Sequence, residues 1–474
     1  MATRTAAPAT TRRIGFESQE EELSVDRLPV RGKLPDWLAG DLVRVTPALL
    51  DVGGRSLRHW FDGLAMLNAF GIEGGRVSYG SRFLDTEVRR QARDGDIGFM
   101  GFAQDPCRSL FKRVMSIASA PRNDNANVNL MKLGEQYLAM TELPMPVEFD
   151  PETLETLGIA DYEDRLAGQV TTAHPHYDPA REEALNYVTY LGPRSSYRLY
   201  TQPAGSRARR RIAKIGVSRP GYMHSFGMSE RYLVLAEFPL VVNPPEIALS
   251  GKAFIHNFRW EPERGTRFIV VDRHSGELRG VYEGPAFFCF HHVNAFERGD
   301  ELIVDVCAYD DPAIIDLLEV ERLRDGDRIP PVRLQRCRLD LESGRVEYEQ
   351  LSDKSLELPR INYGAVNTRD YHHVYGAATH SEQSDWSDEL VKVDVQGGEA
   401  LAWHEPGCYV GEPVFVASPE RRAEDDGVVL SVVLDAAAGR SFLLVLDAGS
   451  FEELARADAP QRIPFGFHGQ FFRS

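Results

Sequence analysis

The chain has 474 residues, a net charge of −17 and an isoelectric point near 5.3, which argues against binding to nucleic acid. Its five cysteines are odd in number, scattered and never in a Cys-x-x-Cys pair, so a reducing, cytoplasmic location is expected and a disulfide framework is not. Nowhere do about 18 apolar residues run together, so the sequence predicts no membrane-spanning helix.

The first elements are predicted from turns and alternation. Residues 1–22 lack an apolar segment, so we expect a disordered N-terminus followed by a single domain over residues 23–474. Residues 28–47 contain prolines and glycines spaced along the segment, and they are predicted to form strand with turns. Residues 59–85 alternate apolar and polar side chains around a Gly-Gly pair, which is typical of a β-hairpin.

Helical periodicity is scarce, with one exception. Within residues 98–118, Phe102, Leu110 and Phe111 fall on one side of a predicted amphipathic helix. The segment is interpreted either as a helix that packs on the domain or as a surface that contacts a membrane peripherally.

A weak repeat runs through the rest of the chain. Strand pairs are joined by a turn that begins with aspartate, and these aspartates are separated by 122, 68, 54 and 53 residues: Asp150, Asp272, Asp340, Asp394 and Asp447. Units of this length, each made of short antiparallel strands, are typical of an all-β fold of the β-propeller class. No proline-rich or serine-rich linker divides the units, so one domain is predicted.

Four histidines lie in strongly apolar settings far apart in the sequence. They are His174 in TTAHPHYD, His224 in GYMHSFGM, one member of the His291–His292 pair in AFFCFHHVNAFE, and His468 in PFGFHGQF. A buried imidazole must be hydrogen-bonded or bind something, because burying its charged form is costly. The inner strands of a propeller point at a common axis, so we expect the four imidazoles to meet around one metal. Ligand chemistry alone leaves iron, copper, zinc and nickel open.

Three glutamates also stand in apolar segments, each followed within two residues by proline: Glu142, Glu357 and Glu412. A metal-binding imidazole usually donates its other N–H to a carboxylate or carbonyl, so these glutamates are predicted to support the histidines.

The ordered motifs HWFDGLAM, DNANVN, TELPMP, TAHPHYD, MHSFGMS, FHHVNAFE, LELPRIN, GEPVFV, EDDGVVLSVV and FHGQF resemble the carotenoid cleavage oxygenase family over nearly the whole chain. The resemblance implies a seven-bladed β-propeller with a cap of loops and short helices over a substrate tunnel. It implies Fe(II) on the propeller axis, bound by His174, His224, His291 and His468. His291 is preferred to His292 because the family pattern places a histidine three residues before an asparagine, here Asn294.

The same resemblance implies the reaction. A conjugated double bond of a carotenoid or apocarotenoid is cleaved with molecular oxygen into two carbonyl products, and no residue beyond the metal centre acts as acid or base. DPCRSLFKR and DNANVN are similar to the branch that contains the animal carotene oxygenases and the retinal pigment epithelium isomerohydrolase. Stilbene-cleaving relatives carry lysine before the first glutamate, where this chain has Thr141, so an apolar polyene is favoured.

Residues beside these motifs are candidates for the substrate tunnel: Phe61, Thr141, Tyr363, Phe467 and Phe471. Stilbene cleavage and retinoid-ester isomerohydrolysis on the same iron remain alternatives. A propeller that binds apolar ligands without catalysis, and a zinc hydrolase, are alternatives from other classes. The zinc hydrolase is disfavoured because catalytic zinc usually has three protein ligands and a nearby general base.

Overall fold

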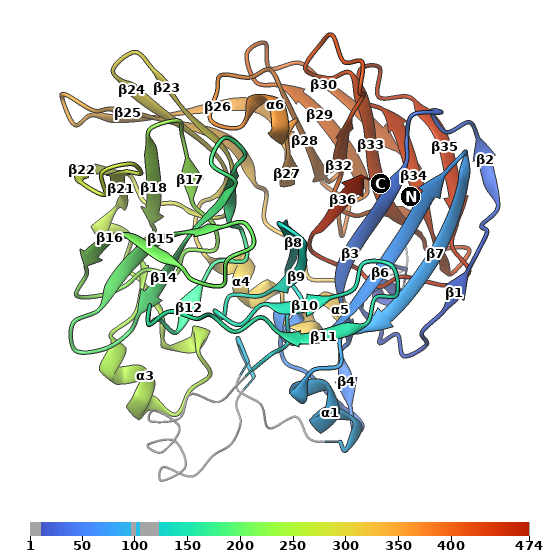
Figure 1. Ribbon diagram of the computed structural model, residues 1–474, viewed down its shortest axis with the longest axis horizontal. Coiled ribbons are helices and arrows are strands. Elements are labelled where there is room, and N and C mark those ends of the chain that lie inside the picture. Colours follow the sequence, from blue (N-terminus) through green and yellow to red (C-terminus); the bar gives the residue numbers. More distant parts are fainter. Residues whose placement is uncertain (1–10, 96–100, 105–122, 474) are drawn as a thin grey trace, which may run out of the picture.

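The computed structural model describes residues 11–95, 101–104 and 123–473, and most of its regular structure is β-strand. Seven antiparallel sheets of four to six strands stand around a common centre (Figure 1). Strands β8, β27 and β36 lie nearest that centre in this view. The predicted seven-bladed β-propeller is therefore confirmed.

Each blade is built mainly from consecutive strands. The first three blades, in hydrogen-bonded order, are β1 (Ser24–Val25), β7 (Arg76–Phe83), β6 (Leu64–Glu73), β3 (Gly40–Leu49) and β36 (Gly469–Arg473); then β11 (Thr156–Ile159), β10 (Val147–Phe149), β9 (Gln136–Met140) and β8 (Asn129–Leu133); then β12 (Val170–Thr171), β14 (Glu183–Tyr190), β15 (Ser196–Pro203) and β16 (Arg210–Gly216), with β13 (His176–Asp178) beside β14.

The other four blades follow the same plan. They are β17 (Gly227–Met228), β18 (Tyr232–Glu237), β21 (Thr266–Asp272) and β22 (Leu278–Gly284); then β23 (Phe288–Arg298), β24 (Glu301–Tyr309), β25 (Arg333–Asp340) and β26 (Val346–Ser355); then β27 (Glu357–Arg360), β28 (His373–Ala378), β29 (Glu389–Asp394) and β30 (Ala400–His404); then β2 (Val30–Gly32), β35 (Glu453–Asp458), β34 (Arg440–Asp447), β33 (Gly427–Asp435) and β31 (Cys408–Val410), with β32 (Val414–Ala417) beside β33.

The ring is closed twice by strands from opposite ends of the chain. The C-terminal strand β36 pairs with β3 in register from Gly40 opposite Arg473 to Arg44 opposite Gly469. The N-terminal strand β2 pairs with β35 in the last blade. These two pairings satisfy strand edges that would otherwise be exposed, and they place the residue before β36 at the centre.

The aspartate repeat corresponds to one turn type used in five blades. Each of the five aspartates follows or ends the third strand of its blade, counted in hydrogen-bonded order from β8, β17, β23, β27 or β31. Its Oδ1 accepts the backbone N–H groups two and three residues later: Asp150, Asp272, Asp340, Asp394 and Asp447. This is the local side-chain turn that aspartate favours. The predicted hairpin is also confirmed, because β6 and β7 pair around Gly74 and Gly75, both with positive φ.

The remaining elements are short and connect or cover the blades. They are the ribbons β4 (Asp51–Val52) with β5 (Arg55–Ser56) and β19 (Leu240–Val241) with β20 (Arg259–Trp260), the helices α1 (Glu87–Arg93), α3 (Pro244–Ser250), α4 (Ala313–Leu317), α5 (Val320–Asp325) and α6 (Tyr363–Val366), and the 3₁₀ turns η1 (Arg12–Phe16), η2 (Trp60–Asp62), η3 (Ile255–Asn257) and η4 (Pro262–Arg264). Among the residues described, none of these helices has the length and apolar character needed to cross a membrane.

Two predictions concern segments that the structure describes only in part, the N-terminus and residues 98–118. Disorder to residue 22 is wrong for η1, because Phe16 is fully buried against Trp60 and Phe465, and the Arg12 side chain donates to the carbonyl of Leu323. Apolar burial of one phenylalanine and a satisfied guanidinium therefore hold this segment on the propeller. Residues 1–10, and most of the predicted helix over 98–118, lie outside the described residues.

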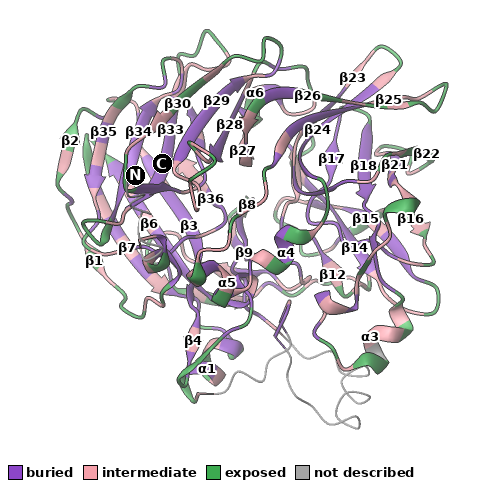
Figure 2. Ribbon diagram, turned by 180° about the vertical axis from the view of Figure 1, so that it is seen from behind, coloured by how far each residue is buried: buried purple, intermediate pink, exposed green. Residues whose placement is uncertain are grey.

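Buried residues are concentrated in the middle strands of the blades, such as β18 and β33, whereas outer strands such as β22 and β30 carry exposed residues (Figure 2). The largest apolar cluster joins η1 and η2 to the β23 blade and includes Trp60, Phe290 and Phe467. Other apolar clusters lie between neighbouring blades. Because the blades are held rigidly on both sides, side chains at their inner ends have fixed positions.

Candidate metal centre

Four blades each deliver one histidine to the centre of the ring. His174 lies between β12 and β13, His224 precedes β17, His291 is within β23 and His468 precedes β36. One nitrogen from each imidazole lies within 4.8 Å of the others. The Nε2 atoms of His174 and His224 are 3.1 Å apart, and those of His291 and His468 are also 3.1 Å apart. The structure thus brings together the four histidines that the sequence singled out.

Backbone contacts between blades position these histidines. The backbone N–H of His174 donates to the Thr172 hydroxyl oxygen at 3.0 Å, and this hydroxyl donates to the carbonyl of His224. The backbone N–H of His468 donates to the carbonyl of Val128 at 3.2 Å. Adjacent blades are therefore tied together at the ligand positions themselves.

The His291–His292 pair is divided by the geometry of β23. The strand shifts register between Cys289 and His292 and again between His292 and Asn294. His291 enters the four-histidine group, whereas Nδ1 of His292 lies 2.8 Å from the Ser225 hydroxyl oxygen. Adjacent residues of a strand face opposite sides, so only one of the pair reaches the centre.

Three of the imidazoles are hydrogen-bonded to the three predicted glutamates. Nδ1 of His224 is 2.7 Å from Glu142, Nδ1 of His291 is 2.5 Å from Glu357, and Nδ1 of His468 is 2.6 Å from Glu412. A carboxylate only accepts at neutral pH, so each Nδ1 carries the proton and each Nε2 keeps a free lone pair. Among the described residues, His174 has no such carboxylate partner.

Burial favours the neutral imidazole at two of the four histidines. Burial lowers the pKa of His174 well below its usual value, and the three neighbouring histidines lower it further. Burial lowers the pKa of His468 to about 4, although Glu412 opposes the shift. Close lone pairs on neutral nitrogens repel one another unless a cation lies between them. The donor set, four imidazole nitrogens supported by three carboxylates, therefore fits a divalent first-row metal.

Aromatic rings cover one side of the histidine group. Phe61 stacks on His224 with ring centroids 5.8 Å apart, and Phe290 contacts the same imidazole edge-on at 5.3 Å. Phe467 packs on Phe61 at 5.1 Å and on Trp60 at 4.1 Å. The surroundings of the nitrogens are thus apolar and aromatic on this side.

The other three predicted tunnel residues lie in different surroundings. Thr141 lines a small cavity between the β8 and β14 blades. Tyr363 is 40% exposed, and its hydroxyl lies 3.0 Å from Nδ1 of His176. Phe471 packs against the apolar cluster that contains Leu42. Of the five, Phe61 therefore contacts an imidazole of the group, and Phe467 packs on Phe61.

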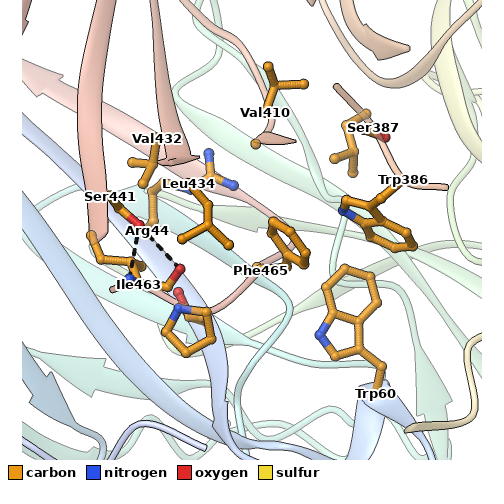
Figure 3. Close-up of a pocket in the computed structure, with 15 residues that line it drawn as sticks. Arg44, Trp60, Trp386, Ser387, Val410, Val432, Leu434, Ser441, Ile463 and Phe465 are labelled. Carbon is orange, nitrogen blue, oxygen red and sulfur yellow. Dashed lines mark hydrogen bonds between the residues drawn. The ribbon is translucent and has the colours of Figure 1, made fainter. Parts of the chain in front are cut away.

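A cavity of about 40 Å³ is lined in part by Phe465 and Gly466, shortly before His468 in the chain (Figure 3). Trp60, Trp386 and Phe465 form one wall of the cavity, and Arg44 is part of another. A space of this size holds a few water molecules. It is too small for a polyene and does not represent a substrate site.

Four residues around the site were missed by the sequence reasoning: Arg44, Trp60, Phe290 and Arg360. Phe290 is next to His291, and Trp60 is in HWFDG, so their neighbours in the motifs were a usable signal. Arg44 lies buried in β3 between the apolar residues Val43 and Val45, where an unpaired charge would be costly. Arg360 follows Glu357 in LELPRIN, and only the fold shows which carboxylate it meets.

Comparison with known proteins places the chain. The family model for the retinal pigment epithelial membrane protein matches residues 16–473. The mitochondrial carotenoid-cleaving dioxygenase of Macaca fascicularis is 35% identical, over 93% of this chain and 91% of its own length. The β,β-carotene 15,15′-dioxygenase of Gallus gallus is 31% identical, over 96% and 97%.

Solved structures of a cyanobacterial protein share the fold. A mutant of Synechocystis apocarotenoid oxygenase superposes with a TM-score of 0.89 at 27% identity, covering 99% of this chain and 100% of that one. The cobalt-substituted form of the same protein gives 0.88 at 27% identity, covering 98% and 99%. By the family model, the relatives and the four-histidine propeller together, the chain belongs to the carotenoid oxygenase family, that of the retinal pigment epithelial membrane protein.

Proposed function

We propose that the protein is an Fe(II)-dependent oxygenase that cleaves a conjugated double bond of a carotenoid or apocarotenoid into two carbonyl products, with molecular oxygen as co-substrate. The observation that carries this proposal is the group of four histidines, three of them hydrogen-bonded to carboxylates. The names of the relatives support the reaction, and the cobalt-substituted relative supports a divalent first-row metal.

The protein's own residues have three tasks in this proposal. The imidazoles of His174, His224, His291 and His468 would hold the metal. Bound there, Fe(II) supplies the activation of dioxygen. The glutamates fix the tautomer and orientation of three imidazoles and offset part of the metal's charge.

The aromatic wall accounts for the substrate side. Phe61, Phe290 and Phe467 provide apolar surface beside the nitrogens and exclude water from them. A hydrocarbon polyene gains from such surroundings, whereas a phenol hydroxyl would need a polar partner. We infer that Phe61 and Phe467 contact the substrate. We also infer that residues 23–474, together with the packed η1 segment, work as one domain.

The proposed setting is the reducing interior of a cell. The four cysteines within the described residues, Cys289, Cys307, Cys337 and Cys408, are free and buried, which agrees with this setting. Peripheral contact with a membrane through residues 98–118 remains part of the proposal, since an apolar substrate partitions into lipid.

The test is an assay of the iron-loaded protein on a panel of carotenoids and apocarotenoids. We expect oxygen uptake matched by aldehyde or ketone products, and loss of both in His468→Ala. Isomerisation of a retinyl ester without oxygen uptake would favour the isomerohydrolase alternative, and turnover of hydroxystilbenes alone would favour the stilbene alternative.

A propeller that only binds apolar ligands is separated by metal content. Reconstituted wild-type protein is expected to hold about one equivalent of iron, measured by elemental analysis after gel filtration. Less than about half an equivalent, together with unchanged carotenoid binding, would favour the non-catalytic alternative.

A further inference from the structure

The three carboxylates that accept hydrogen bonds from the histidines differ in their other hydrogen-bond donors. Glu142 also accepts from the hydroxyl of Tyr222 at 2.8 Å, and Glu357 also accepts from the backbone N–H of Leu358 at 2.7 Å. Both of these donors are neutral. Both carboxylates therefore keep their full negative charge beside the imidazoles.

Glu412 is bonded to two arginines instead. Nε of Arg360 lies 2.8 Å from Oε1, the same oxygen that accepts from His468, and Nη1 of Arg44 lies 3.4 Å from Oε2. The side chains of Arg44 and Glu412 are 4% and 1% exposed, and that of Arg360 is 22% exposed. Charges this well buried interact strongly, because little water screens them.

The same arginines hold the backbone on both sides of His468. Nη2 of Arg44 donates to the carbonyl of Phe467 at 2.9 Å, and Nη2 of Arg360 donates to the carbonyl of Gly469. The backbone N–H of Gly469 donates in turn to Glu412 at 2.9 Å. Each guanidinium therefore contacts both the carboxylate and the chain that carries the ligand.

This arrangement changes how strongly Nε2 of His468 can donate electron density to a metal. A carboxylate bonded to Nδ1–H makes Nε2 a better electron donor. A guanidinium bound to the same carboxylate reduces this increase, because it neutralises part of the carboxylate's charge. Two arginine charges also offset two of the three carboxylate charges around the histidines, so a bound cation experiences a more positive surrounding than the glutamates alone would produce.

We propose that Arg44 and Arg360 are positioning residues that screen Glu412, make His468 the weakest donor of the three carboxylate-backed ligands, and so favour the ferrous over the ferric state. The inference rests on the proposed metal-dependent function and extends it. A more positive surrounding disfavours the more highly charged ion, which is the physical reason for the direction.

The experiment compares Arg360→Gln, which removes the charge, with Arg360→Lys, which keeps it. The midpoint potential of the iron-loaded protein is measured by mediated titration, and Co²⁺ affinity of the metal-free protein by calorimetry. Arg360→Gln is expected to lower the potential and to bind Co²⁺ about threefold or more tightly than wild type, because a positive charge near the cation is gone. Arg360→Lys is expected to stay close to wild type in both.

Arg336→Gln serves as the matched control. Like Arg360, Arg336 is paired with a buried carboxylate, at 2.8 Å from Asp305, but that carboxylate accepts a hydrogen bond from Tyr371 and not from a histidine. Its loss is expected to lower the melting temperature without moving the potential.

Three results would overturn the inference: an unchanged potential and affinity in Arg360→Gln, equal shifts in the Gln and Lys variants, or weaker Co²⁺ binding in Arg360→Gln. Failure of the wild-type protein itself to bind stoichiometric Co²⁺ would instead overturn the metal-dependent function.

Discussion

At the scale of single residues, the two members of the His291–His292 pair have separate tasks. His291 is in the four-histidine group, and His292 contacts Ser225. We expect His291→Ala to lose iron and activity together, whereas His292→Ala keeps close to one equivalent of iron. Elemental analysis of both purified variants checks this. Equal iron content in the two variants would show that the ligand within the pair is misassigned.

Asp62 is a second residue with a distinct role, in the turn of the HWFDG motif. Its two carboxylate oxygens accept the backbone N–H groups of Phe102, at 2.6 Å, and Ala103, at 3.1 Å. Burial raises the pKa of Asp62 to about 7, although these hydrogen bonds oppose the shift. The motif therefore has a structural part, since the Asp62 carboxylate holds a neighbouring loop.

The raised pKa predicts the sign of a pH effect. Between the unfolded pKa near 4 and the folded pKa near 7, the folded protein binds the proton that the unfolded chain has lost, so stability falls as pH rises. Relative to Asp62→Asn, wild type should lose on the order of 2–4 kcal/mol of unfolding free energy from pH 4 to pH 7. Urea unfolding at several pH values measures it. Parallel pH profiles for the two proteins would contradict the assignment.

At the scale of elements, the repeated aspartate turn is the unit that the blades share. In β29 the Asp394 carboxylate accepts from the backbone of Gln396 at 2.8 Å and of Gly397 at 3.2 Å. Asp394→Ala leaves these N–H groups without their partner and should cost about 1 kcal/mol of stability. Asp353→Ala, at an exposed position of β26, is the control and should be neutral. Denaturant unfolding compares them, and equal losses would show that the turn contributes nothing specific.

Strand β23 shows why one element matters more than its length suggests. The Asn294 side chain donates to the carbonyls of Val366 and Arg369, both at 3.0 Å, and so ties this strand to the segment after α6. The asparagine that serves as a sequence marker for His291 is therefore a connector between two blades. Its role is structural, since it holds the strand that carries His291 against the neighbouring blade.

At the scale of the whole molecule, closure of the ring determines stability. Gly40 begins β3 with a φ of +138°, and a Cβ there would lie 2.2 Å from the carbonyl oxygen of Phe472 in β36. Gly40→Ala should therefore strain the closing pair and cost about 2–4 kcal/mol. Gly364→Ala, where a Cβ meets nothing within 4 Å, is the control. Comparable unfolding midpoints for both variants would argue against closure as the weak point.

Metal binding should also stabilise the molecule as a whole, because its proposed ligands come from four blades. A hundredfold excess of Fe²⁺ over its dissociation constant under anaerobic conditions should add about 3 kcal/mol to the folded state. The melting temperature of the metal-free protein, with and without Fe²⁺, measures this, and His468→Ala should show a much smaller rise.

The sequence was sufficient to predict the local chemistry and the meeting of four histidines on one axis, but not the individual contacts between blades. Repeated aspartate turns, alternating strands, four histidines in apolar segments and three glutamates before prolines are all local patterns, so sequence alone determined the propeller class and the candidate ligands. The tertiary structure decided which glutamate meets which histidine, and that only Phe61 and Phe467 of the predicted tunnel residues lie beside the site. It alone revealed Arg44 and Arg360 on Glu412. These contacts join blades separated by tens to hundreds of residues, and their distances depend on how the ring closes.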